Sequence, residues 1–323
     1  MKECAMAPAA PSSRSSPSSP TVAAPAPLLR VVVPYPAGGG LDAVVQIVFR
    51  RLSARSGRNV VIDHRVGASG MVGAAFVAGA APDGLTLLAT VADTQINNAE
   101  VFLHLPYDPA RDFMPVIQLA RGAAVMVVPE SVPADTLAGF AAYARGQREK
   151  LSYGSWSIGG LGHLMTEAFN RFGQLGMLHS PRCGDRGLVK LLLEGGVSLA
   201  MGSLAGFAPH LRSGALRALA VSGPQRLAAL PDTPTFGEQG YAANVFELLV
   251  WMGLLAPSRT PPEVISGLNA EVAAVLAEDA TRRELEALGA VPVGGGPAEF
   301  AAALESHRPV LASLIRDCGL EAR

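Results

Sequence analysis

The residues Val31-Val32-Val33-Pro34-Tyr35-Pro36-Ala37-Gly38-Gly39-Gly40-Leu41-Asp42 decide the fold of this 323-residue chain. Three consecutive β-branched residues predict a buried strand, and the Pro- and Gly-rich segment after them predicts a sharp turn. We expect Asp42 to cap a helix whose buried stripe comes from Val44, Val45, Ile47, Val48 and Leu52. A helix start presents unpaired backbone N–H groups and the positive end of the helix dipole, so this one suits an anion.

The kind of anion follows from what the loop lacks. No Lys-Ser/Thr pair stands at the helix start, which argues against a Walker phosphate loop. The glycines are contiguous, whereas a dinucleotide fingerprint needs spaced glycines. The remaining hypothesis is a carboxylate held by backbone amides. The alternative is a glycine-rich turn between a strand and a helix that binds nothing.

Composition limits the classes of function. A hydrophobic content of 49% with 16% charged residues is typical of a globular protein, and the length suits two domains. A net charge of −1 supplies no field to attract nucleic acid or an anionic membrane, so neither is expected as a partner. The three cysteines and six histidines are scattered, so we expect no disulfide framework, metal site or cofactor. No run approaches the roughly 20 apolar residues that span a bilayer.

The first 27 residues are rich in Ala, Pro and Ser and are expected to be disordered. They form no legible secretory signal, because Glu3 cancels the charge of Lys2 and prolines and serines interrupt any apolar stretch.

From Leu28 onward, predicted strands and helices alternate, which favours an α/β fold with parallel sheets and ligands at the carboxyl ends of the strands. We expect residues 28–117 and 246–323 to form one lobe and residues 118–245 a second. The final helix, opened by Pro297, is expected to pack back on the first lobe. Two crossings between lobes form a hinge of the kind that closes around a ligand.

Several motifs occur in a characteristic order: Val33 to Asp42, the Gly67 to Gly73 loop, Ala80-Ala81-Pro82-Asp83-Gly84-Leu85, Leu105-Pro106-Tyr107-Asp108-Pro109, Leu230-Pro231-Asp232-Thr233-Pro234-Thr235 and Gly253-Leu254-Leu255-Ala256-Pro257. In this order and spacing, the chain from Leu28 to its end resembles the periplasmic solute-binding proteins of tripartite tricarboxylate transporters, the Bug-type receptors.

The resemblance implies a two-lobed Venus-flytrap protein of the type II periplasmic-binding-protein class. It implies a monomer in the periplasm that holds a mono-, di- or tricarboxylate, aromatic ones included, and passes it to membrane permease subunits without catalysis. The ligand-binding positions implied in this chain are Tyr35, Pro36, Ala37, Gly38, Gly39, Asp42, Ser69, Thr90, Asp93, Ser155, Trp156, Ser157, Gly159, His163, Arg182, Asp185 and Ser203.

The chain departs from the family pattern mainly in these loops. Small hydroxyl residues are usual before the histidine, but Gly160, Leu161 and Gly162 stand here. The usual aromatic-Lys-Gly is Arg182-Cys183-Gly184, with Asp185 behind it. These changes predict an unusual ligand or the loss of ligand binding.

Three of the implied residues keep a second interpretation. Asp42 is expected to serve as a helix cap more than as a ligand contact. Arg182 either pairs with a ligand carboxylate or faces solvent beside Asp185. Trp156 either stacks on a planar ligand or plugs the cleft.

Two other functions remain open. A hydrolase could use Ser155 or Ser157 with His163, although the segment lacks a G-x-S-x-G elbow. A regulatory protein could contact a sensor in place of a permease, and the N-terminus without a legible export signal keeps that alternative open.

Overall fold

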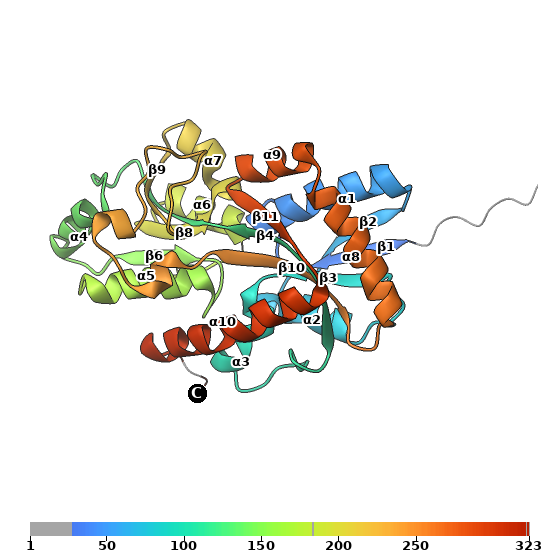
Figure 1. Cartoon of the computed structure of the whole chain (residues 1–323). Coiled ribbons are helices and arrows are strands. Elements are labelled where there is room, and N and C mark those ends of the chain that lie inside the picture. Colours follow the sequence, from blue (N-terminus) through green and yellow to red (C-terminus); the bar gives the residue numbers. More distant parts are fainter. Residues whose placement is uncertain (1–27, 183, 321, 323) are drawn as a thin grey trace, which may run out of the picture.

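The chain forms two β-sheets, each flanked by helices, in a computed structural model that describes residues 28–182, 184–320 and 322 (Figure 1). The disorder expected for residues 1–27 lies outside the described residues. The first sheet has the order β11-β4-β10-β3-β1-β2, and the second has the order β7-β6-β8-β5-β9. The predicted two-lobed α/β class is confirmed.

The strands of the first sheet are β1 (Leu29–Val33), β2 (Val60–His64), β3 (Thr86–Thr90), β4 (Phe113–Gly122), β10 (Val250–Pro257) and β11 (Ala290–Gly294). Those of the second are β5 (Ala124–Pro129), β6 (Ser152–Ser155), β7 (Leu178–Pro181), β8 (Leu199–Ser203) and β9 (Leu216–Val221). The α-helices are α1 (Gly40–Ser56), α2 (Met71–Ala78), α3 (Asn98–Val101), α4 (Leu137–Arg145), α5 (Leu161–Phe172), α6 (Gly184–Leu193), α7 (Leu204–Arg212), α8 (Pro262–Leu276), α9 (Asp279–Ala287) and α10 (Pro297–Asp317).

Both sheets are mixed, so the expectation of parallel sheets was wrong in part. Strand β1 pairs in parallel with β2 and β3, as strand–helix alternation predicts. Strand β10, however, runs antiparallel to both β3 and β4. In the second sheet, β5 runs antiparallel to β8 and β9. Strand β10 enters the first sheet from far along the chain, and local patterning does not reveal the direction of such a pairing.

The chain passes between the sheets later than expected at both crossings. Residue 117 falls inside β4, which continues to Gly122 because β10 pairs along its whole length. At the second crossing, Asn244–Glu247 forms a short 3-10 helix, and β10 begins only at Val250. We call residues 28–122 and 250–320 lobe 1, and residues 123–249 lobe 2.

The core of lobe 1 lies between α1, the first sheet and α8. The predicted apolar stripe of α1 is buried except for Ile47, which is half-buried. Val45 of the stripe and Phe49 beside it are fully covered. They belong to one hydrophobic cluster with Val31, the middle residue of β1, and with Val272 of α8. Each fully buried side chain of this size contributes about 1.5–3 kcal/mol to folding, so this packing holds the glycine loop after β1 in place.

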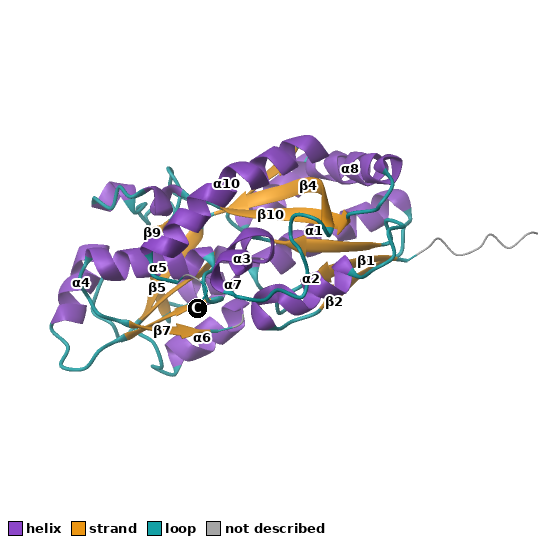
Figure 2. Ribbon diagram, turned by 90° about the horizontal axis from the view of Figure 1, so that it is seen from below, coloured by secondary structure: helices purple, strands orange, loops and turns teal. Residues whose placement is uncertain are grey.

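Helix α10 packs on β4 of lobe 1, as expected, but its C-terminal end also reaches lobe 2 (Figures 1 and 2). The guanidinium of Arg171 on α5 donates hydrogen bonds to the backbone carbonyls of Asp317 and Cys318. Cationic donors suit the orphan carbonyls of a helix C-terminus. Helix α10 therefore joins the two lobes. Within the described part of the chain, no helix combines the length and apolar character needed to cross a bilayer.

Candidate ligand-binding site

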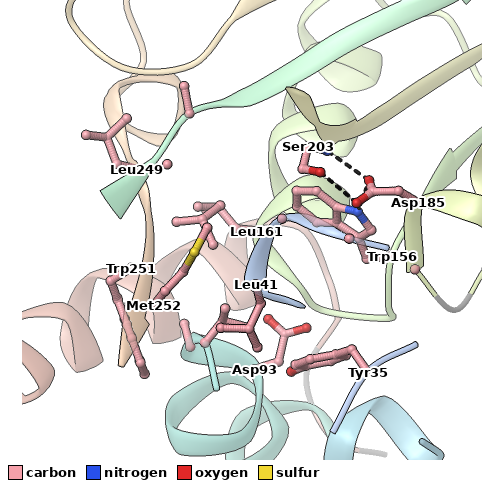
Figure 3. Close-up of a pocket in the computed structure, with 18 of the residues that line it drawn as sticks. Tyr35, Leu41, Asp93, Trp156, Leu161, Asp185, Ser203, Leu249, Trp251 and Met252 are labelled. Atoms are coloured by element: carbon pink, nitrogen blue, oxygen red, sulfur yellow. Dashed lines mark hydrogen bonds between the residues drawn. The ribbon is translucent and has the colours of Figure 1, made fainter. Parts of the chain in front are cut away.

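A pocket lies between the lobes and is lined by both of them (Figure 3). Eight of the residues expected at the site line it: Tyr35, Pro36, Gly39, Asp42, Asp93, Trp156, Asp185 and Ser203. The rest of its wall is mostly apolar. It consists of Gly40, Leu41, Val91, Ala92, Gly122, Ala123, Leu161, Gly184, Leu248, Leu249, Val250, Trp251, Met252 and Leu311, together with His307 of α10. Apolar walls with a few polar groups are typical of small-molecule sites.

The start of α1 differs from the predicted cap. Helix α1 begins at Gly40 with Gly39 as its N-cap, so Asp42 is the third helical residue and not the cap. Asp42 still serves the helix start, because its Oδ2 accepts a 2.8 Å hydrogen bond from the backbone N–H of Gly38. Its Oδ1 lies 2.7 Å from Nε2 of His64 on β2. A carboxylate in the first turn also complements the helix dipole.

Asp185, at the start of α6, lies at the centre of the polar side of the pocket. Its Oδ1 accepts hydrogen bonds from Trp156 Nε1 at 2.7 Å and from the backbone N–H of Ser203 at 2.9 Å. Its Oδ2 accepts one from Ser203 Oγ at 2.7 Å, and Figure 3 shows the bonds from Ser203. The start of α1 in lobe 1 lies close to the same carboxylate, because a Cβ on Gly39 would lie 3.1 Å from Asp185 Oδ2. The predicted anion position at α1 is therefore occupied by a carboxylate of the protein itself.

The loop after β6 in lobe 2 is hydrogen-bonded to Asp93 and Asn97 of lobe 1. Ser157 Oγ donates to Asp93 Oδ2 at 2.5 Å, and Asn97 Nδ2 donates to the backbone carbonyl of Gly159 at 3.0 Å. Burial raises the pKa of Asp93 to about 6, although the bond from Ser157 favours its charged form. Gly160 permits this approach, because a Cβ there would lie 2.9 Å from Asp93 Oδ2 and closer still to Ser157.

Removing the bond between Asp93 and Ser157 is expected to weaken ligand binding. A hydrogen bond to a charged group contributes about 1.5–3 kcal/mol, and this one forms between lobes, so its loss disfavours the closed state. We expect Asp93→Ala and Ser157→Ala each to lower ligand affinity about tenfold or more, measured by calorimetric titration. The double variant should lose little more than either single one. Fully additive losses would contradict this role.

Several residues expected at the site do not line the pocket. Ala37 and Gly38 are exposed. Thr90 is buried, with its Oγ1 2.8 Å from Thr94 Oγ1. The backbone carbonyl of Ser69 accepts a bond from Asn98. Arg182 is exposed, and its guanidinium donates to the neighbouring carbonyl of Pro181, so it lies away from the pocket and from Asp185.

Ser155 and His163 belong to a buried cluster behind the loop. The hydrolase hypothesis paired His163 with Ser155 or Ser157, but Ser155 Oγ lies 2.7 Å from Nε2 of His179 and Ser157 Oγ donates to Asp93. His163 Nδ1 instead accepts a 3.0 Å hydrogen bond from the backbone N–H of Gly159. The two imidazole rings stack with centroids 3.6 Å apart. Burial lowers the pKa of His163 to about 4 and that of His179 to about 3, so both are neutral at pH 7.

The apolar wall contributed by β10 and α10 could not be predicted from the sequence. The apolar run that begins at Phe246 signalled a strand there, but not that Trp251 and Met252 would face the cleft. Within residues 28–182, 184–320 and 322, no group of three or more His, Cys, Asp or Glu side chains is placed to hold a metal ion.

The sequence profile of the tripartite tricarboxylate transporter family receptor matches residues 44–316. The chain belongs to this receptor family. BugT of Bordetella pertussis is 28% identical over 300 residues, which cover 93% of this chain and 91% of BugT. Among solved structures of receptors, Rpa4515 of R. palustris with adipate is 33% identical with a TM-score of 0.88, covering 93% of this chain and 99% of that one. MatC of Rhodopseudomonas palustris with bound malate is 27% identical with a TM-score of 0.82, covering 90% and 99%.

Membership of the receptor family confirms the resemblance to Bug-type proteins and the two-lobed periplasmic-binding-protein fold. The tricarboxylate transporter receptors to which this chain is similar act by binding solutes, and the solved structures with adipate and malate hold carboxylates.

Proposed function

We propose that this protein is an extracytoplasmic receptor that captures a small carboxylate-bearing solute between its lobes and delivers it to the membrane permease of a tripartite transporter. The observation that carries the proposal is the pocket that both lobes line, closed by the bonds from Ser157 to Asp93 and from Asn97 to Gly159. Closure of two lobes around a ligand is a common use of this architecture. Relatives in the family include periplasmic binding proteins, which supports a periplasmic location.

The protein acts by binding and not by catalysis. Among the described residues near the loop after β6, the hydrogen-bonded serine–histidine pair is Ser155 with His179. Ser155 is fully buried, and neither residue lines the pocket. A histidine with a pKa of about 3 is also a weak general base at neutral pH. These features support a receptor rather than a hydrolase.

A thermal-shift screen tests the proposal. Any solute that binds only the folded state raises its stability, by about 2.7 kcal/mol at a concentration 100-fold above Kd. We expect at least one small carboxylate to raise the melting temperature by several degrees. Its uncharged amide should act far more weakly.

A variant with a filled pocket provides the control. Ala92 lines the pocket, and Ala92→Phe should abolish the shift by occupying it. Ala110 is exposed on the connector before β4, and Ala110→Phe should leave the shift unchanged. A carboxylate shift that persists in folded Ala92→Phe would place the binding elsewhere and contradict the proposal.

A further inference from the structure

The carboxylate of Asp185 is buried and surrounded by hydrogen-bond donors. Asp185 is 2% exposed and accepts three hydrogen bonds from Trp156 and Ser203 of lobe 2. The start of α1 in lobe 1 lies against it, because a Cβ on Gly39 would lie 3.1 Å from its Oδ2. Charge-assisted hydrogen bonds to a carboxylate are the strong class. Burial raises the pKa of Asp185, and these donors oppose that shift.

The backbone around Asp185 is shaped to admit its side chain. Glycines from three elements surround it: Gly39 before α1, Gly202 on β8 and Gly206 on α7. A Cβ at Gly206 would lie 2.2 Å from the Cβ of Asp185, and one at Gly202 would lie 2.9 Å from its Oδ1. A Cβ at Gly39 would approach Oδ2 to 3.1 Å. No residue larger than glycine fits at these three positions without displacing Asp185. The backbone is therefore shaped to hold this carboxylate.

The remaining pocket offers little to a second anion. Among its described lining residues, only His307 can carry a positive charge, whereas Asp42, Asp93 and Asp185 are acidic. A ligand carboxylate placed beside Asp185 would meet like charge at close range and would find the local donors already used. The opposite wall is different. There Trp251 is 3% exposed, and its indole nitrogen has no hydrogen-bond partner among the described residues.

We propose that Asp185 determines specificity by occupying the anion position at the start of α1, so that the pocket accepts an apolar monocarboxylate and rejects dicarboxylates. The ligand's single carboxylate then lies toward Trp251 and His307, and its apolar body lies against Leu41, Leu161 and Met252. This inference rests on the proposed function and narrows its class of substrate.

Calorimetric titration of the wild type and two variants tests this specificity. Hexanoate and benzoate serve as monocarboxylate probes, and adipate and malate as dicarboxylate probes. Wild type should bind its better monocarboxylate at least tenfold more tightly than either dicarboxylate. Asp185→Ser frees the donors of Trp156 and Ser203 and vacates the start of α1, and it should improve dicarboxylate affinity at least tenfold. Asp185→Asn, which keeps the shape and removes the charge, should improve it less.

A matched control separates local from overall charge. Asp135 lies in the same lobe with its side chain 82% exposed, and Asp135→Ser changes the net charge equally. It should leave the preference unchanged. Trp251→Phe should lower monocarboxylate affinity about fivefold or more.

The outcomes separate this inference from the proposed function. If the wild type binds no probe but Asp185→Ser binds adipate, the role of Asp185 is supported and the receptor function of the wild type is overturned. If the wild type binds adipate as tightly as hexanoate and benzoate, or if both folded Asp185 variants gain no dicarboxylate affinity, the role of Asp185 is overturned while receptor function stands.

Discussion

Replacing Phe300 by alanine is expected to lower the free energy of unfolding by about 3–5 kcal/mol, the range for removing a buried phenylalanine ring. Phe300 is 2% exposed on α10, and its ring lies over Gly253 of β10. It also packs edge-on against Trp251, with ring centroids 5.5 Å apart at 74°. Because Gly253 has no side chain, nothing beneath the ring can move to fill the cavity.

Urea denaturation measures this loss, and Leu103→Ala provides its control. Leu103 is 64% exposed, so truncating it should change stability by no more than about 0.5 kcal/mol. Trp251 lines the pocket, so Phe300→Ala should also weaken ligand binding. A loss below 1 kcal/mol for Phe300→Ala would mean that α10 does not depend on this packing.

Acid is expected to destabilise the protein between pH 6.5 and about 4, through the stacked pair His163 and His179. Their folded-state pKa values are lowered to about 4 and about 3, whereas the unfolded chain takes up protons near 6.5. The stability that they contribute is therefore complete above pH 6.5 and is lost as the pH falls, by up to about 1.4 kcal/mol per pH unit for each histidine.

Protonation also breaks a specific contact. Nδ1 of His163 accepts from the backbone N–H of Gly159, and a protonated ring cannot accept there. Asp93 acts in the opposite direction, because its pKa, raised to about 6, adds stability as the pH falls through that value. Glu167, whose pKa is lowered, loses its contribution only below its ordinary value near 4.5.

The pH dependence of stability in His163→Gln isolates the histidine contribution. Urea midpoints from pH 7.5 to 4.5 should fall less steeply in the variant than in the wild type, even where the variant is less stable throughout. Asp93 is unchanged in both proteins, so its opposing effect cancels in the comparison. Parallel profiles would show that His163 does not remain neutral in the folded state.

Local patterns in the sequence were enough to predict helices and strands whose residues carry their own signal. The local apolar patterns of residues 137–145 and 161–172 predict helices and that of residues 216–221 predicts a strand. The structure forms α4, α5 and β9 over these residues. Each has its own start signal or its own period of buried residues, so no distant partner is needed to define it.

Features that depend on distant pairing could not be predicted. The length and direction of β4 and β10 depend on contacts between residues more than 100 positions apart. The prediction that Asp42 caps the helix was wrong because the helix starts three residues earlier than predicted. Its N-cap Gly39 and first residue Gly40 fit closely against Asp185 and Ser203 of lobe 2. Asp185 stood out as a departure from the family pattern, but the sequence did not reveal that its carboxylate would lie on α1.

The role of Asp185 is best tested by a crystal structure with the tightest-binding monocarboxylate from the titrations. We expect the ligand between the lobes against Leu41, Leu161 and Met252, with Asp185 still bonded to Trp156 and Ser203. A ligand bound outside this pocket, or one whose carboxylate lies on Gly40 with Asp185 displaced, would contradict it.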